Sequence, residues 1–148
     1  MRAVLGIFLL LILSSCGGDE QAAPATSVEV PELIAVKFFE AVLMRNDLTE
    51  ARKYVVPTMV RVLDTYSSGR GYARTVLNMR FDQVEITVED SNKSVREFYT
   101  SNAEVMLIFV GQYDGNKKTD MRMVKMEKHR GKWLLAEIKN DPFARPGV

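Results

Sequence analysis

The chain has 148 residues, of which 47% are hydrophobic and 26% charged, with 20 basic and 19 acidic side chains and one cysteine. A nucleic-acid-binding domain usually shows a basic excess, so this near-neutral balance argues against nucleic acid as a partner. One cysteine cannot form an internal disulfide, and the length suits a single folded domain.

The first 15 residues have the layout of a cleaved signal peptide: Arg2, then an apolar run over residues 3–13, then two serines. The run is roughly half of the 20 or so residues that a transmembrane helix needs, which argues against a permanent span. The tetrad LSSC at residues 13–16 resembles the lipobox of bacterial lipoproteins, in which the thiol receives a diacylglyceryl group and the signal is cut just before it. The resemblance implies that Cys16 becomes the lipid-carrying first residue of the mature protein.

This expectation places the protein in a bacterial cell envelope, with Cys16 as its membrane anchor. By resemblance to the sorting rule of enteric bacteria, Gly17 after the cysteine favours the outer membrane, facing the periplasm. Residues 17–30 are small and polar and cannot bury enough apolar surface to fold, so we expect a flexible tether. The predicted organisation is a signal peptide (1–15), the lipidated cysteine and tether (16–30), a folded domain (31–143) and a tail (144–148).

The domain is expected to begin with helices. Residues 31–44 start with Pro and Glu and are apolar around most of the helix circumference, so this helix must be enclosed on several sides. The sequence DLTE at residues 47–50 has the form of a capping box and predicts a short second helix to about Val55. Pro57 predicts the start of a third helical stretch that ends near Gly69, and residues 71–79 fit a helix or a loop.

Strands are expected in the second half. Val84, Ile86 and Val88 alternate with polar residues, as in a half-buried strand. The apolar run 103–110 predicts a central strand covered on both faces, and turn signals at 114–116 and 129–132 separate further strands over 119–128 and 133–138. Helices followed by a meander of strands predict an α+β fold, with the N-terminal helices packed in a curved antiparallel four-stranded sheet.

Three segments of this pattern resemble the nuclear transport factor two-like superfamily, especially its small secreted and lipoprotein members: PELIAVKFFEAVLMRND, DLTEARKYVVP and HRGKWLLAEI. The likeness covers most of residues 31–140. It implies a cone-shaped fold whose curved sheet wraps the first helix. It does not imply a function, because this cone hosts isomerases, dehydratases, carriers and interaction modules.

Few residues have the pattern of a catalytic site. His129, the one histidine, falls in a predicted tight turn, away from any pocket that a general base would serve. Glu104 and Asp120 are expected near strand ends that could face the cone mouth, with Tyr99 and Tyr113 as hydrogen-bonding neighbours. These four are candidate ligand-binding residues, although exposed strand ends explain the carboxylates better.

Two further patterns have ordinary explanations. The sequence Gly69-Arg70-Gly71 lacks the rest of a phosphate-binding loop and is expected to be a turn. Met121, Met123 and Met126 contain thioethers that can bind cuprous copper, but in a regular strand Met126 lies on the opposite face, so core filling is the better account. No catalytic residue, metal or cofactor is expected.

The sequence therefore predicts a lipid-anchored, non-catalytic binding module whose partner is an envelope protein or a small apolar ligand. Two alternatives stay open: an envelope enzyme of the isomerase or dehydratase kind that uses a carboxylate and a tyrosine, and a structural homodimer. An open cavity with Asp or Glu beside Tyr favours the enzyme, whereas an interior filled by Phe, Met and Trp favours the binding module.

Overall fold

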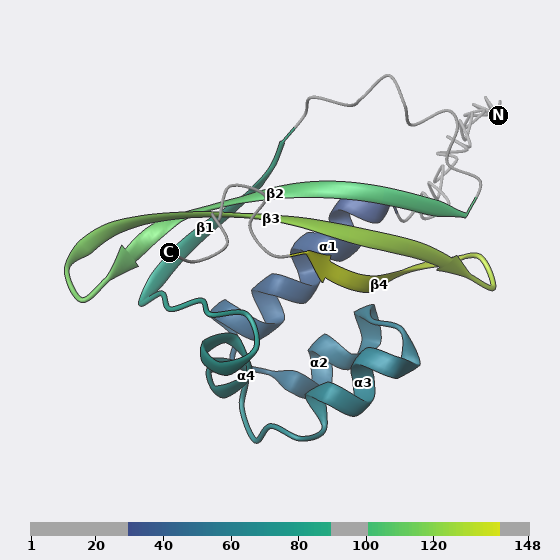
Figure 1. Cartoon of the computed structure of the whole chain (residues 1–148), viewed down its shortest axis with the longest axis horizontal. Helices are drawn as coiled ribbons and strands as arrows, with labels where there is room; N and C mark the ends of the chain where they lie inside the picture. The colour runs from purple at the N-terminus through teal and green to yellow at the C-terminus, as the bar shows by residue number, and fades with distance from the viewer. Residues whose placement is uncertain (1–29, 90–100, 140–148) are drawn as a thin grey trace, which may run out of the picture.

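The computed structural model describes residues 30–89 and 101–139 as an α+β domain in which helices pack on one face of an open, four-stranded antiparallel sheet. Helix α1 lies directly beneath the sheet, and the shorter helices lie below α1 (Figure 1). The predicted fold class is confirmed. The elements are α1 (Pro31–Phe39), η1 (Glu40–Met44), α2 (Leu48–Ala51), η2 (Arg52–Tyr54), α3 (Pro57–Leu63), α4 (Gly69–Thr75), β1 (Gln83–Val88), β2 (Asn102–Tyr113), β3 (Asn116–His129) and β4 (Lys132–Lys139).

The strands follow one another in the sheet in the order β1-β2-β3-β4. Tyr113 pairs with Asn116 across a two-residue turn in which Asp114 and Gly115 have φ of 51° and 73°. Two positive φ values match the twist of the hairpin strands, which explains the Asp-Gly pair. Arg130 and Gly131 form the second turn in the same way, with φ of 50° and 85°.

Helix α1 is enclosed as its wide apolar surface requires. It contacts all four strands as well as α2 and η2. Ile34, Ala35, Phe38 and Phe39 are no more than 2% exposed, and the ring of Phe39 meets Phe109 of β2 edge-on at 4.9 Å. The prediction that this helix is covered on several sides is confirmed.

The C-terminal part of the first predicted helix ends at Met44 as expected, but it is a π-helical segment, η1. The backbone N–H of Arg45 donates to the carbonyl of Glu40 at 2.9 Å, and Asn46 then adopts a φ of 55°. Over five residues the apolar spacing of a π-helix hardly differs from that of an α-helix, so the sequence does not reveal this feature. Asparagine tolerates the left-handed region, which explains how the chain turns there.

The third and fourth helices correct two expectations. Helix α3 ends at Leu63 and not near Gly69, and Gly69-Arg70-Gly71 forms the first turn of α4, so the expected turn at these residues is wrong. Side-chain oxygens satisfy two amides at the start of α4: Ser68 Oγ accepts from the N–H of Gly71 at 3.1 Å, and Asn46 Oδ1 accepts from Arg70 at 2.8 Å. Half of this capping comes from a residue distant in sequence, which local patterns cannot reveal.

The second predicted helix is confirmed in part. Asp47 caps it, because its Oδ1 accepts a hydrogen bond of 2.9 Å from the N–H of Glu50. Glu50 does not complete the capping box, since its carboxylate binds Lys53 and Tyr54. Beyond it, Val55 and Val56 follow the edge of β4, where the N–H of Val56 donates to the carbonyl of Leu135 at 3.0 Å. This contact attaches the short helices to the sheet.

The two faces of the sheet differ. Ala103, Val105, Leu107 and Phe109 of β2 are buried on the helix side. On the other face none of the described helices lies against the strands, and the residues in between are half-buried or exposed, so the expected burial of β2 on both faces is wrong (Figure 1). A continuous apolar run does not distinguish these two cases. No helix among the described residues has both the length and the hydropathy to cross a membrane.

Candidate functional site

An apolar cavity of about 250 Å³ opens between α3, the C-terminal half of α4 and β4. Val62 and Val76 stand on its rim with exposed fractions of 43% and 41%, high values for aliphatic side chains. Its lining, apolar with few polar groups, has the character of a small-molecule pocket, and its volume suits only a small ligand. Its apolar lining consists of Met59, Val62, Val76, Leu77, Ala136 and Ile138.

Tyr72 of α4 gives this otherwise apolar cavity a polar group that can bind a ligand. It is 2% exposed, and its ring meets Phe38 at 6.4 Å and Tyr66 at 5.6 Å, both edge-on. The hydroxyl of Tyr72 has no hydrogen-bond partner within residues 30–89 and 101–139. Every buried side-chain oxygen in these ranges does have a partner, so the Tyr72 hydroxyl is not one of the buried oxygens. The hydroxyl therefore reaches open space, and the cavity that Tyr72 lines provides it.

The environment of Tyr72 keeps the hydroxyl protonated. Burial, with a further contribution from Tyr66, raises the pKa of Tyr72 to about 12. The phenol is therefore neutral over the physiological range and can donate one hydrogen bond into the cavity. An acceptor such as a carbonyl oxygen on an otherwise apolar molecule would satisfy it.

The second buried polar group beside the cavity is Arg122, 7% exposed, which forms an ion pair with Asp120 two residues earlier on β3. Its guanidinium also donates to the carbonyl of Leu77 at 3.0 Å and to that of Met121 at 2.8 Å. Asp120 was expected to face a cone mouth and bind a ligand. The structure instead shows its carboxylate bound by Arg122, an arrangement that connects the segment after α4 to the sheet.

The other candidate carboxylate is also in an ion pair. Glu104 accepts a hydrogen bond of 2.5 Å from Lys139 Nζ on the exposed side of the sheet and does not reach the cavity. Glu137, which the sequence did not single out, does line the cavity, but its carboxylate binds Lys125 Nζ at 2.6 Å. The hydrogen bond and then the charge of Lys125 lower the pKa of Glu137, which makes it a poor general base.

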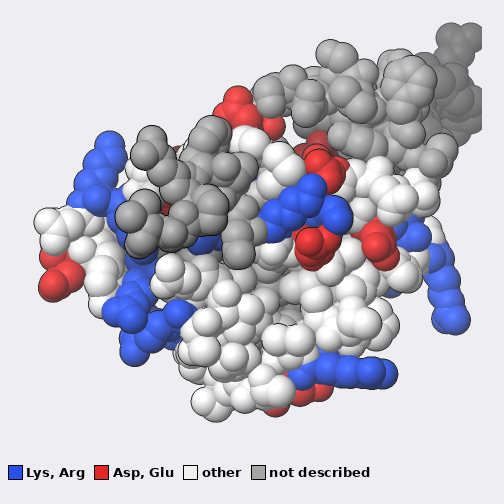
Figure 2. Space-filling view, in the orientation of Figure 1, with Lys and Arg blue, Asp and Glu red and all other residues white. Residues whose placement is uncertain are grey.

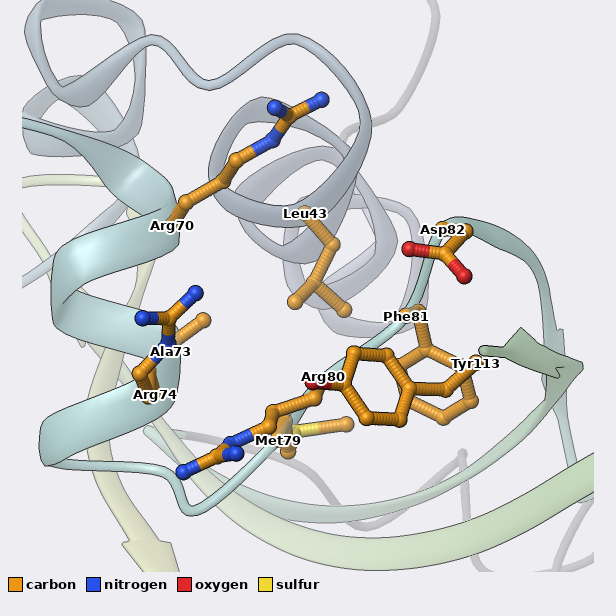
Figure 3. Close-up of a pocket in the computed structure, with 9 residues that line it drawn as sticks. All are labelled: Leu43, Arg70, Ala73, Arg74, Met79, Arg80, Phe81, Asp82 and Tyr113. Carbon is orange, nitrogen blue, oxygen red and sulfur yellow. The ribbon is translucent and has the colours of Figure 1, made fainter. Parts of the chain in front are cut away.

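Among the described residues, Tyr113 is a predicted ligand-binding residue that lines a cavity. It ends β2, is 36% exposed and lines a second hollow on the other side of α4 (Figure 3). Tyr99 and Cys16 lie outside the described residues. The predicted group of four is therefore not brought together: Tyr113, Glu104 and Asp120 occupy three different environments.

Sequence reasoning missed Tyr72 because residues 71–79 had no clear pattern. Tyr72 and Val76 are four residues apart, which places both on one side of a helix, and this is the signal that could have found them. The sequence Gly69-Arg70-Gly71 directly before Tyr72 concealed the helix, since such a sequence is typical of a turn. The cavity itself needs β4, which is distant in sequence.

The three methionines and His129 lie where the strand pattern predicted them, along β3 and at its end. Met126 is 0% exposed in the core while Met121 and Met123 lie on the opposite side of β3, so the three sulfurs do not share a face. His129 lies at an exposed turn, where Nε2 is 3.0 Å from Glu127 Oε2. Within the part of the chain that the structure describes, no group of His, Cys, Asp and Glu has the geometry of a metal site.

Comparisons of the chain with known protein families, with curated proteins and with solved structures find no match.

Proposed function

We propose that this protein is an exported bacterial lipoprotein whose domain binds a small apolar ligand without transforming it. The observation that carries the proposal is the hydroxyl of Tyr72: its ring is buried, but the hydroxyl is unpaired in the described structure and open to an apolar cavity of about 250 Å³. A donor that opens into an apolar cavity finds few acceptors there, and a ligand that accepts its hydrogen bond satisfies it. The ligand class is an apolar molecule with one acceptor oxygen.

Interior packing supports binding over catalysis. Phe38, Phe39, Phe109, Met79 and Met126, each no more than 1% exposed, fill the core of the domain, where a catalytic cone would be hollow. In the apolar cavity, both charged lining residues are already in ion pairs: Glu137 with Lys125, and Arg122 with Asp120. An isomerase or dehydratase needs a free carboxylate beside the tyrosine.

The order of the elements supports membership of the nuclear transport factor two-like superfamily. The helices come first and an antiparallel meander of strands follows, with α1 against every strand. The sheet here is open, so the proposed relationship is to the open cone of that superfamily. The envelope location rests on the sequence LSSC at residues 13–16 and on the leader before it.

A pair of probes tests the ligand class on the full-length chain in neutral detergent. Acetophenone and ethylbenzene have nearly the same shape, but only acetophenone has an acceptor oxygen. We expect saturation-transfer NMR to show that acetophenone binds, and that Tyr72→Phe weakens its binding about 5-fold to 10-fold while leaving ethylbenzene unchanged. Tyr66→Phe is the matched control, because Tyr66 contacts the ring of Tyr72 but does not line the cavity.

Two results would contradict the proposal. One is equal binding of acetophenone to the native chain and to Tyr72→Phe; the other is no saturable binding of either probe. The anchor is tested separately, by mass spectrometry of the N-terminal peptide of the protein recovered from its native cell. We expect that peptide to begin at Cys16 and to contain acyl groups.

The outer face of the sheet favours a second candidate function, protein association. Apolar side chains there are only half-buried among the described residues, and Met106 lies directly opposite Met123, and Ile108 opposite Met121. Methionine-rich surfaces adapt to partners. A second copy of the chain is the partner to test first: light scattering of the detergent-solubilised full chain should give twice the monomer mass, and Met121→Lys should restore the monomer.

A further inference from the structure

The second cavity, of about 280 Å³, lies on the other side of α4 from the apolar one. Arg70, Ala73 and Arg74 of α4 line it, whereas Tyr72 of α4 and Val76, its C-cap residue, line the apolar cavity. Leu43 of η1 forms its floor, and Phe81 and Tyr113 lie across it from α4 (Figure 3). Two cavities of different chemistry therefore share one short helix.

Positive charge dominates this cavity. Arg70, Arg74 and Arg80 are exposed, and their guanidinium groups form no ion pair or hydrogen bond with any residue of 30–89 or 101–139. The carboxylate in the lining, Asp82, already accepts a hydrogen bond of 2.8 Å from the N–H of Asp114. Basic side chains also gather at the end of the molecule where the β2–β3 hairpin lies (Figure 2).

The arrangement is unfavourable for the fold alone. Arg70 and Arg74 are four residues apart on α4 and lie on the same side of the helix, where like charges repel. Three other arginines in the described structure have acidic partners, since Arg45 pairs with Glu40, Arg52 with Asp64 at 2.7 Å and Arg122 with Asp120. A ligand with negative charge would turn this repulsion into attraction.

We propose that this cavity binds the phosphate group of a small ligand. Guanidinium groups present two parallel donors that match the oxygens of an oxyanion. One guanidinium group can bind both oxygens of a carboxylate, whereas a phosphate has enough oxygens to bind several guanidinium groups. Three arginines without partners around one hollow therefore favour phosphate. The aromatic rings of Phe81 and Tyr113 form an apolar wall for the remainder of the ligand, and the Tyr113 hydroxyl adds a further donor.

This site is separate from the apolar cavity and does not depend on the function proposed for it. The phosphate could belong to a soluble ester or to a lipid headgroup, since both present the same oxygens. A lipid anchor at Cys16 would place the domain near headgroups, within the roughly 50 Å that a 14-residue tether can reach. The experiment must distinguish these two sources.

The test is an NMR titration of the full-length chain in neutral detergent micelles, which follows the arginine Nε–H signals. Inorganic phosphate is added and compared with chloride at equal ionic strength. We expect saturable shifts of the pocket arginine signals with phosphate, and an apparent Kd about 10-fold higher in Arg74→Gln and in Arg80→Gln. Arg61→Gln is the matched control, because Arg61 is an exposed arginine on α3 outside the cavity, and its Kd should equal that of the native chain.

A second arm adds phosphatidylglycerol to the micelles. Displacement of inorganic phosphate would assign the site to a lipid headgroup, whereas no displacement would assign it to a soluble phosphate; both support the site. Equal shifts with chloride and phosphate would overturn it, and so would an equal loss of affinity in Arg61→Gln and Arg74→Gln. Unchanged circular dichroism of the variants would show that the fold is intact.

Discussion

Helix α4 presents two unlike surfaces to the molecule. On one side Tyr72 and Val76 face an apolar cavity next to a buried ion pair; on the other, Arg70 and Arg74 face a hollow without a carboxylate partner. The first side is largely satisfied within the fold, since Arg122 and Asp120 neutralise each other there. The second side keeps its charge unpaired in the described structure. The difference separates polar groups that are paired within the fold from those that we propose to bind a ligand.

The largest expected effect comes from breaking the buried ion pair beside the apolar cavity. In Arg122→Met the Asp120 carboxylate loses its partner while its side chain stays only 11% exposed. We expect the free energy of unfolding to fall by about 3 kcal/mol in urea denaturation, because an unpaired charge would remain buried. Adding Asp120→Asn removes that charge and should recover most of the loss. A single variant as stable as the double variant would contradict the assigned role.

The second-largest effect is expected from disturbing the close contact between α4 and η1 at Gly69. A Cβ added at Gly69 would lie 2.4 Å from the backbone oxygen of Val42, and backbone cannot move aside easily. We expect Gly69→Ala to lower the unfolding free energy by about 2 kcal/mol. Gly71→Ala is the control, because its nearest neighbour is the Ser68 side chain at 3.1 Å, and it should stay within about 1 kcal/mol of the native chain. Similar losses in both variants would show that α4 does not depend on this contact.

A pH experiment sharpens the account of Tyr72. Its pKa is raised to about 12 in the folded chain, whereas an unfolded tyrosine titrates near pH 10. The contribution of Tyr72 is complete below about pH 10 and is lost as the pH rises towards about 12, because the unfolded chain releases the proton first. Between about pH 9 and about pH 12, Tyr72→Phe should lose about 2 kcal/mol less stability than the native chain. Tyr66→Phe, which removes only the smaller contribution of Tyr66 to the raised pKa of Tyr72, should lose nearly as much as the native chain does.

The smallest effect has the opposite sign. In low salt without phosphate, Arg74→Gln removes the repulsion with Arg70 and should raise the unfolding free energy by about 0.3 kcal/mol. Arg61→Gln should not. If Arg74→Gln is instead less stable than the native chain, the arginine contributes to the fold, and the contrast between the two sides of α4 is lost.

Much of the fold could be predicted from local pattern. The Asp-Gly turn between β2 and β3, the alternation in β1 and the cap at Asp47 each depend on residues close in sequence. The helix start at Gly69 could not, because Asn46 supplies part of its cap from 24 residues away. The π-helical segment η1 could not be predicted, because its apolar spacing hardly differs from that of an α-helix over one turn.

The candidate site was predicted less well, and the residues show why. Asp120 and Glu104 were correct as strand residues, but their partners, Arg122 and Lys139, decide whether a carboxylate is available. Tyr113 was expected beside Glu104 and Asp120, but it lines a separate cavity at the end of β2. Tyr72 could not be predicted as a site residue, because its role depends on its tertiary surroundings: the rings of Phe38 and Tyr66, and the cavity wall from β4.

By itself the sequence determined the α+β class, the turns and the apolar surface of α1, because each depends on spacing and on backbone preferences within a few residues. Only the tertiary structure decided which polar groups are paired and where space is left, because pairing and cavities depend on side chains brought together from distant segments. Arg122 and Arg74 have the same guanidinium group. One meets Asp120 and the carbonyl of Leu77, and the other meets open space beside Arg70.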